Sequence, residues 1–189
     1  MAQVLIDATV SLDGFMADAA GGMDWMDGFP VVAEDEELVG AVVQQVGAII
    51  GGANKTQTIE DEETPYGGSL GVPVYLMTHS AHEPIEKDGV TYTFVVDDIA
   101  EAVEAAKKVA GEKKVSLLGG SISRQCLELG LVDEIQLHVV PVILGAGISL
   151  FTGLTKPIRL ERVESSAFAA EVHLRYRVIG SASDRVSGS

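Results

Sequence analysis

Two glycine pairs in the chain stand where a strand could end and a phosphate could bind. Gly119 and Gly120 end an apolar run and precede a helix-compatible stretch at residues 121–129. Glycine adopts the backbone angles of a tight turn at little cost. A helix that starts with bare backbone also offers free N–H groups to an anion such as phosphate. The pair, with the amides of Ser121 and Ile122, can therefore serve a turn, a phosphate site or both.

The second pair, Gly51 and Gly52, also ends an apolar run, and the polar residues Lys55 and Thr56 follow it. The carboxyl ends of parallel strands share one edge of a sheet, where open α/β sheets bind their ligands. If both glycine pairs lie at that edge, they can hold the two ends of one pyrophosphate. Lys55 would then supply a positive charge and Thr56 a hydroxyl group.

A polar triplet follows a third apolar run, at Thr78, His79 and Ser80. These side chains suit a ribose or its phosphate at the same edge. The sequence has neither GxGxxG nor GxxxxGK[ST], so it carries no ordinary dinucleotide fingerprint and no nucleotide-hydrolase loop.

The four histidines show no metal-binding pattern. His79 and His82 stand in an expected loop and His138 and His173 in expected strands, with no HxxxH pair and no cysteine partners. We expect the strand histidines to be satisfied polar positions of a sheet, and we predict no metal site. The sequence also lacks a GxSxG motif, so serine–histidine hydrolysis is unsupported.

Composition narrows the function further. The 189 residues carry a net charge of −15, which argues against a nucleic-acid partner and against an anionic membrane surface. The single cysteine, Cys126, excludes an internal disulfide, indicates a reducing compartment and is expected to be a small buried hydrophobe. The N-terminus lacks a signal-peptide pattern and no apolar run is long enough to span a bilayer, so we expect a cytoplasmic protein without membrane contact.

The elements that must position these residues alternate along the chain. We predict one domain over residues 1–180 and a flexible polar tail over 181–189, with a loop at 11–32. The predicted helices cover residues 33–46, 98–110 and 121–129. The predicted strands cover 3–10, 47–52, 72–78, 90–96, 115–118 and 134–143, with an antiparallel pair at 158–179. This order predicts an α/β domain with a mixed sheet.

Taken together, several segments resemble one known family. They are SLDGF at 11–15, DW at 24–25, IIGGANKT, VYLMTHS, VSLLGGSI and LGLVDEIQLHVVPVILGAGISLF. The chain resembles the dihydrofolate-reductase-like family, in particular the reductase domain of riboflavin-biosynthesis deaminase-reductases and its stand-alone relatives. The resemblance extends over residues 3–179, and residues 130–151 are its most specific part.

The resemblance implies a fold, a cofactor and an activity. The fold is a three-layer α/β/α arrangement with a mixed, mainly parallel central sheet and antiparallel C-terminal strands. The implied protein is a homodimer that uses NADPH to transfer a hydride to a C=N or C=O bond of a small substrate, such as a pterin or pyrimidine. The alternative is a dimeric nucleotide-binding protein that keeps this fold without turnover.

The resemblance also implies site residues. Those bordering the nicotinamide are Ala8, Ser11, Asp13 and Gly14, with Trp25 as a further cofactor contact. Those serving the pyrophosphate and adenosine are Gly51, Gly52, Lys55, Thr56, Gly119, Gly120, Ser121 and Ile122. Thr78, His79 and Ser80 lie near the 2′-phosphate in this scheme.

Two departures and three alternatives qualify this scheme. Lys55 replaces the arginine of a common Gly-Arg-x-Thr motif, and Leu117-Leu118 stand where riboflavin-type reductases carry a substrate-binding glutamate. The second departure argues against the riboflavin intermediate as substrate. Asp13 is either catalytic or a hydrogen-bonding loop anchor, and Trp25 either contacts the cofactor or fills the core. The four acids at 34–37 are expected to form a solvated first helical turn rather than to hold the proton donor.

Overall fold

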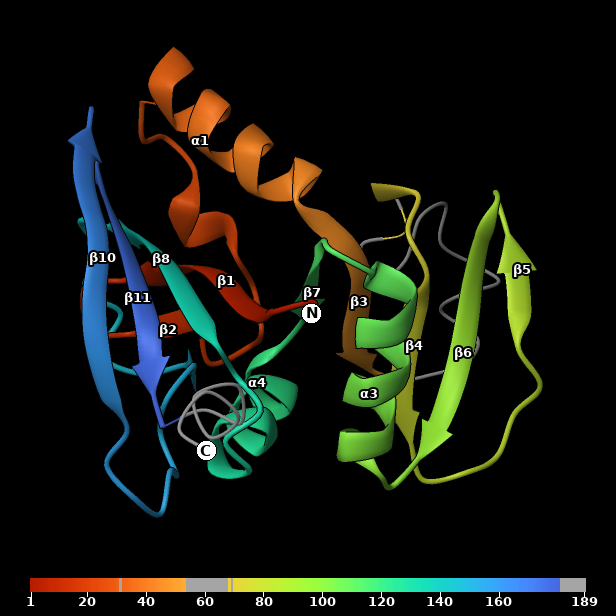
Figure 1. The fold of residues 1–189 in the computed structure, drawn as a ribbon. Coiled ribbons are helices and arrows are strands. Elements are labelled where there is room, and N and C mark those ends of the chain that lie inside the picture. Colours follow the sequence, from red (N-terminus) through yellow and green to blue (C-terminus); the bar gives the residue numbers. More distant parts are fainter. Residues whose placement is uncertain (31, 54–67, 69, 181–189) are drawn as a thin grey trace.

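The computed structural model describes residues 1–30, 32–53, 68 and 70–180, and in this part of the chain nine strands form one sheet (Figure 1). The strand order is β10-β11-β8-β1-β7-β3-β4-β6-β5. These strands are β1 (Val4–Ser11), β3 (Val46–Gly52), β4 (Val74–Thr78), β5 (Ile85–Lys87), β6 (Val90–Val96), β7 (Lys114–Leu117), β8 (Glu134–Val140), β10 (Arg159–Phe168) and β11 (Glu171–Ile179).

The centre of the sheet is parallel and both of its ends are antiparallel. Strands β8, β1, β7, β3, β4 and β6 pair in parallel, whereas β10, β11 and β5 pair antiparallel with their neighbours. Two further short strands, β2 (Phe15–Ala17) and β9 (Ile148–Ser149), form a separate pair. The predicted mixed, mainly parallel sheet with antiparallel C-terminal strands is confirmed.

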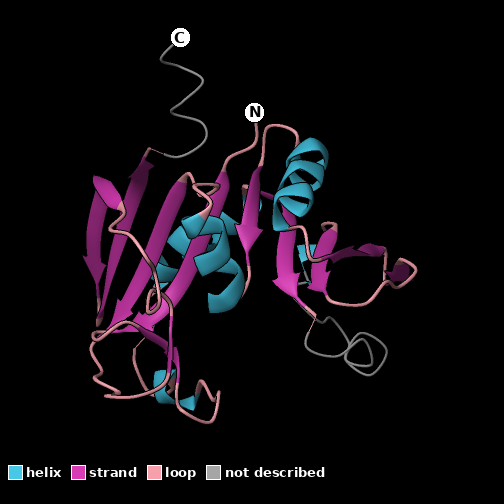
Figure 2. Cartoon of the chain, turned by 90° about the horizontal axis from the view of Figure 1, so that it is seen from below, coloured by secondary structure: helices cyan, strands magenta, loops and turns pink. Residues whose placement is uncertain are grey.

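Helices cover both faces of the sheet. The helices are α1 (Ala33–Gln44), α3 (Ile99–Ala110) and α4 (Gly120–Glu128), with a short 3-10 helix η1 (Asp24–Met26). α3 and α4 lie against one face and α1 over the other (Figure 1), and Figure 2 shows the same elements from below. Asp98 caps α3 by accepting a hydrogen bond from the N–H of Glu101, 2.9 Å long, which explains where this helix begins.

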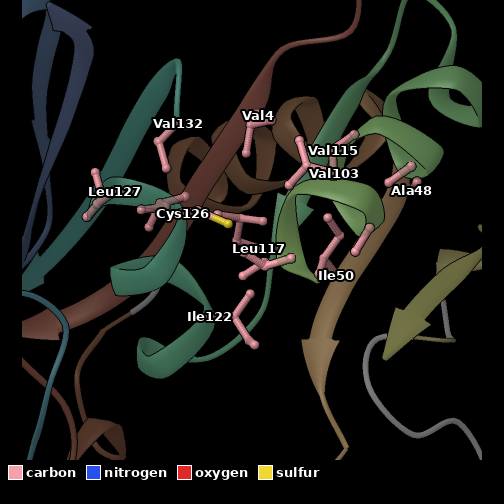
Figure 3. Packing of buried hydrophobic residues seen from close by; sticks show 14 of the residues in the cluster. Val4, Ala48, Ile50, Val103, Val115, Leu117, Ile122, Cys126, Leu127 and Val132 are labelled. Atoms are coloured by element: carbon pink, nitrogen blue, oxygen red, sulfur yellow. The ribbon is translucent and has the colours of Figure 1, made fainter. Parts of the chain in front are cut away.

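The main core lies between the sheet and the α3–α4 layer (Figure 3). Side chains alternate across a strand, so every second residue of β1 faces this layer. The fully buried members include Val4, Val103, Val115 and Cys126. A second buried cluster surrounds β3, β4 and β6. Burying each large aliphatic side chain contributes about 1.5–3 kcal/mol, so these layers hold the strand ends in fixed positions.

The structure corrects several predicted boundaries. The helix predicted at 33–46 ends at Gln44, because Val46 already pairs with Lys114 as the first residue of β3. The strand predicted at 134–143 ends at Val140, and the loop predicted at 11–32 contains β2 and η1. Strands β5 and β9 were not predicted. The predicted tail lies outside the described residues.

Within the ranges the structure describes, no helix is both long and apolar enough to cross a membrane.

Candidate active-site cleft

A cleft of about 710 Å³ opens at the carboxyl ends of the parallel strands. Its walls come from β1, from the residues that follow β3 and β4, and from the junction between β7 and α4. Met16, Ile148 and Leu150, from β2 and the segment containing β9, form another wall. The cleft therefore lies at the edge where open α/β sheets bind ligands.

Many of the sequence-predicted site residues meet at this cleft. Its lining contains Ala8, Gly52, Thr78, His79, Gly119, Gly120, Ser121 and Ile122. These residues belong to four segments that are far apart in the sequence. Parallel pairing of β1, β7, β3 and β4 brings the segments together.

The other predicted residues lie elsewhere. Ser11, Asp13, Gly14, Trp25, Gly51 and Ser80 do not line the cleft. Lys55 and Thr56 lie outside the described residues.

The junction between β7 and α4 gives the cleft its anion-binding character. Gly119 has a φ of 93°, which a residue with a side chain adopts only at a cost. The first helical hydrogen bond runs from the N–H of Ser123 to the carbonyl of Gly119, at 3.1 Å. The preceding N–H groups, of Gly120, Ser121 and Ile122, therefore have no partner within the helix. Three amides at a positive helix end suit a phosphate group.

Gly120 also meets a packing requirement. A Cβ atom there would lie 3.2 Å from the carbonyl oxygen of Ser149 and 3.7 Å from the sulfur of Met16. That carbonyl accepts a 2.9 Å hydrogen bond from Nη1 of Arg124. The glycine thus allows α4 and the segment around β9 to approach closely at the wall of the cleft.

Asp13 anchors a loop rather than facing the cleft. Its Oδ1 accepts hydrogen bonds from Oγ of Ser11 at 2.6 Å and from the N–H of Leu144 at 3.1 Å. Its Oδ2 accepts one from the N–H of Gly145 at 2.7 Å. The hydrogen bond from Ser11, helped by the two amides, holds the pKa of this exposed carboxyl below its ordinary value. These contacts favour the loop-anchor alternative over a catalytic acid.

Trp25 lies in η1 and is half-buried, two residues after Met23, which does line the cleft. Its ring N–H is buried and has no hydrogen-bond partner among the described residues. The only tryptophan therefore lies close in sequence to the cleft wall without forming part of it.

His79 carries a charged neighbour at the rim. Its Nδ1 lies 2.5 Å from Oδ1 of Asp97, the residue that follows β6, and both side chains are exposed. Both residues line the cleft beside Thr78. A carboxylate thus accompanies the imidazole at the place where the resemblance implies the 2′-phosphate.

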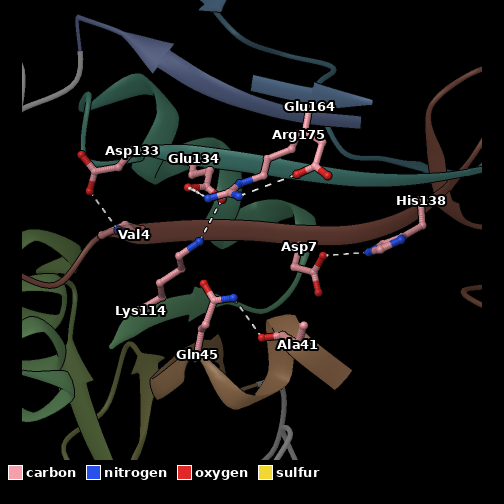
Figure 4. Close-up of polar contacts among 10 residues, drawn as sticks. All are labelled: Val4, Asp7, Ala41, Gln45, Lys114, Asp133, Glu134, His138, Glu164 and Arg175. Atoms are coloured by element: carbon pink, nitrogen blue, oxygen red, sulfur yellow. Dashed lines mark hydrogen bonds and ion pairs between the residues drawn. The ribbon is translucent and has the colours of Figure 1, made fainter. Parts of the chain in front are cut away.

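Sequence reasoning missed a buried chain of polar side chains that starts in the cleft. Asp7 lines the cleft, and its Oδ1 lies 3.0 Å from Nε2 of His138 (Figure 4). Nδ1 of His138 lies 2.7 Å from Nδ1 of His173, whose Nε2 lies 2.8 Å from Oδ1 of Asp35. Asp35 is only 4% exposed, so the expectation that residues 34–37 form a solvated turn is wrong for this residue. The available signal was a polar residue at every second position of β8, Glu134, Gln136 and His138.

The same side of the sheet carries a buried ion-pair group. Glu134 accepts hydrogen bonds from Nζ of Lys114 at 2.9 Å and from Nε and Nη2 of Arg175 at 2.5 and 3.1 Å (Figure 4). Burial tends to raise the pKa of Glu134, but the hydrogen bonds from Arg175 and Lys114 outweigh it and lower the pKa overall. This group and the histidine pair form a polar layer between α1 and the sheet.

Apolar side chains line much of the remaining cleft. Met77, Leu117 and Leu118 contribute, and Leu118 is exposed. Leu117 and Leu118, which stand where the resemblance implies a substrate-binding glutamate, thus give this part of the cleft an apolar surface.

Comparisons with known proteins agree with this architecture. A family model described as the RibD C-terminal domain matches residues 2–174. The chain is 30% identical over 181 residues to the uncharacterized protein YyaP of Bacillus subtilis (strain 168), covering 90% of this chain and 91% of that one. A putative riboflavin biosynthesis protein from Shewanella sp. PV-4 is similar in structure, with a TM-score of 0.75 and 23% identity over 94% of this chain and 99% of that one. Dihydrofolate reductase from Enterococcus faecalis, complexed with NADP(H), gives a TM-score of 0.61 and 12% identity over 94% and 96%.

Proposed function

The chain belongs to the RibD C-terminal domain family, and from that premise we propose that it is an NADPH-dependent reductase. It transfers a hydride to a C=N or C=O bond of a small substrate, of which pterins and pyrimidines are the first candidates. The single observation that carries the proposal is the start of α4, where the amides of Gly120, Ser121 and Ile122 have no partner within the helix and border a large cleft at the strand ends.

The lining residues fit such a cofactor. The amides of α4 and the left-handed turn at Gly119 would hold the pyrophosphate. Ala8 would border the nicotinamide, and Thr78 and His79 would border the adenosine ribose. A net charge of −15 does not oppose this, because the contacts are local backbone dipoles.

Hydride donation is the chemistry that NADPH supplies when bound. The protein has to align the nicotinamide with the substrate and keep water away. Met16, Met77 and Leu150 provide an apolar wall suited to that task. Asp7 is the acidic group on the β1 side of the cleft and can supply the proton that accompanies the hydride.

Substrate selection would follow from the apolar wall as well. Leu118 cannot hydrogen-bond a ribityl or amino group as the family's glutamate does. We therefore propose a substrate other than the riboflavin intermediate, planar and with few polar substituents on the side that meets Leu118.

The proposal includes a homodimer in the cytoplasm. Strand β8 lies between β11 and β1 inside the sheet, so it offers no free edge to a second subunit. The outer strands offer better support: Leu160, Val163, Val172 and Ile179 are 40–51% exposed on β10 and β11. Light scattering on the purified protein tests this, with the mass of two chains expected and the mass of one chain contradicting it.

The test of function is loss of NADPH absorbance in the presence of a panel of pterins and pyrimidines that carry C=N or C=O bonds. We expect saturable oxidation of NADPH with at least one member. Binding of NADPH without turnover of any compound would favour the non-catalytic nucleotide-binding alternative. Absence of NADPH binding would overturn both.

A further inference from the structure

Four side chains link the cleft to the interior beneath α1 by three successive hydrogen bonds. They run Asp7–His138–His173–Asp35, with separations of 3.0, 2.7 and 2.8 Å. Each histidine turns its Nε2 to a carboxylate and its Nδ1 to the other histidine. The four residues come from β1, β8, β11 and α1, so the chain crosses three neighbouring strands and ends in a helix.

The two ends of this chain differ in exposure. The side chain of Asp7 is 23% exposed and lines the cleft. His138, His173 and Asp35 are at most 4% exposed. Asp7 is therefore the member of the four that opens to the cleft, while His173 lines a smaller cavity beside α1.

The hydrogen bonds fix how many protons the chain must hold. Three bonds among four groups need three protons. Two carboxylates and two neutral imidazoles carry only two, and would leave one bond without a hydrogen. A filled chain therefore carries one proton more than its separate neutral imidazoles would, so the two imidazoles together carry one positive charge and are flanked by two carboxylates. Opposite charges at this distance stabilise that state.

The groups around these four side chains favour the ionised form of Asp35, the carboxyl group at the buried end. The N–H of Val32 donates to Oδ2 of Asp35 at 3.0 Å, and this hydrogen bond, opposed by burial and helped by His173, lowers the pKa of Asp35. The ring of Phe168 contacts His173, with centroids 5.5 Å apart. A carboxylate oxygen of Glu171 lies within 4.8 Å of a ring nitrogen of His138 and of His173 and adds a further acid. The neighbouring cations, Lys114 and Arg175, are already paired with Glu134.

We propose that Asp7, His138, His173 and Asp35 form a proton store that delivers one proton through Asp7 to the substrate atom left negative by hydride addition. The delivery step rests on the proposed reductase function. Asp7 is then the catalytic acid, and the two histidines and Asp35 hold its proton in reserve.

The step balances in atoms and charge. In the resting chain, His138 carries hydrogen on Nε2 and His173 on both nitrogens. The Nδ1 proton of His173 moves to Nδ1 of His138 while the Nε2 proton of His138 moves to Asp7. The O–H bond of Asp7 then breaks as the new N–H or O–H bond of the product forms. The chain is left one proton short, and solvent replaces that proton through Asp7 when the cleft empties.

The stored proton can be measured without cofactor or substrate. Long-range ¹H–¹⁵N spectra of the histidine-labelled protein at about pH 8.5, above the ordinary histidine pKa of about 6.5, distinguish imidazolium from neutral rings. We expect the His138–His173 pair to retain three ring protons, while His79 and His82 serve as references. Asp35→Asn removes one of the two flanking charges, and the pair should then lose its extra proton at a lower pH. Two neutral rings with one N–H each in the wild type would overturn the proposal.

A second use of the same side chains is tested in parallel. His138, His173 and Glu171 have ligand atoms close enough for a metal ion. One outcome is that one Zn²⁺ binds per protein molecule and displaces the shared proton, and that Glu171→Gln abolishes this binding. That result would overturn the proton store in favour of a metal site. If Glu171→Gln leaves the imidazole signals unchanged and Zn²⁺ does not bind, the proton store is supported.

Delivery is tested with any substrate that the wild type reduces. His173→Gln interrupts the chain away from the cleft, so the affinity for NADPH should stay within about twofold. We expect kcat at alkaline pH to fall by about tenfold or more, because a positioned acid is worth about 10²–10⁴ in rate. At acidic pH, solvent can protonate Asp7 directly and kcat should recover. An equal loss at every pH would overturn the delivery step. Failure of the wild type to bind NADPH would instead overturn the proposed function and leave the spectroscopic result standing.

Discussion

Asp13 and Gly145 are joined by a 2.7 Å hydrogen bond from the N–H of Gly145 to Oδ2 of Asp13, across 132 positions of sequence. The bond ties the turn after β1 to the loop after β8. Oδ1 of the same carboxylate takes the N–H of Leu144 and the hydroxyl of Ser11. Asp13 therefore holds together the turn that precedes β2 and the loop that precedes β9.

We expect Asp13→Asn to lower the free energy of unfolding at neutral pH. The pKa of Asp13 is below its ordinary value of 3.8, so its contribution is complete above that value and disappears as the pH falls through the lower, folded-state pKa. Urea unfolding of the wild type and the variant between pH 3 and pH 8 measures this. Their difference should shrink at the acid end. Unchanged stability together with lost turnover would instead make Asp13 the proton donor.

Asp97→Asn should favour NADPH over NADH. Removing the carboxylate beside His79 removes repulsion from a 2′-phosphate and frees the imidazole to meet it. Because both side chains are exposed, the effect is small, about twofold to fivefold in affinity. Parallel titrations with the two cofactors measure the ratio. An equal change for both would mean that the pair is remote from the 2′ position.

Glu134→Ala should be among the most destabilising single changes on the α1 side of the sheet. It leaves the largely buried ammonium of Lys114 without the carboxylate of Glu134 and leaves the guanidinium of Arg175 to the more distant Glu164, at 4.0 Å. Removing one partner of a buried ion pair costs about 3–5 kcal/mol of unfolding free energy. The matched control is Glu161→Ala, which removes the exposed partner of Arg177 and should cost less than about 1 kcal/mol. Equal costs for the two variants, measured by urea unfolding, would contradict the account.

Cys126 should be inert in the folded protein. Burial in the main core raises the pKa of its thiol to about 12, so almost no thiolate exists at neutral pH. A thiol-specific reagent at about pH 8 should react only after urea unfolds the protein. Rapid reaction with the native protein would show that α4 opens readily.

The fold and the meeting of the glycine segments were predictable because both are encoded in local pattern. Apolar runs that end in Gly51-Gly52 and Gly119-Gly120 predict the ends of two strands. Parallel pairing of these strands then places both glycine pairs at the same edge of the sheet. The roles of Asp7, Asp35, His138 and His173 were not predictable in this way. Asp35 is one of four acids at 34–37 and His138 one of three alternating polar residues of β8, so the local sequence does not single them out. Strand register and the position of α1 bring the four side chains together. The errors in predicted boundaries have the same cause, because they depend on contacts with distant residues. Val46 belongs to β3 rather than to the preceding helix because it pairs with Lys114.

The most direct test of the central claim, that α4 holds the phosphates of NADPH, is a titration of wild type, Ser121→Asp and Ser121→Asn followed by Trp25 fluorescence. Ser121 is exposed in the first turn of α4, where an acid does not disturb the helix, whereas any side chain at Gly120 would press on Ser149. We predict saturable quenching by NADPH in the wild type and in Ser121→Asn, with affinity at least about tenfold weaker in Ser121→Asp because its carboxylate repels phosphate. Equal affinity in all three proteins would contradict the claim.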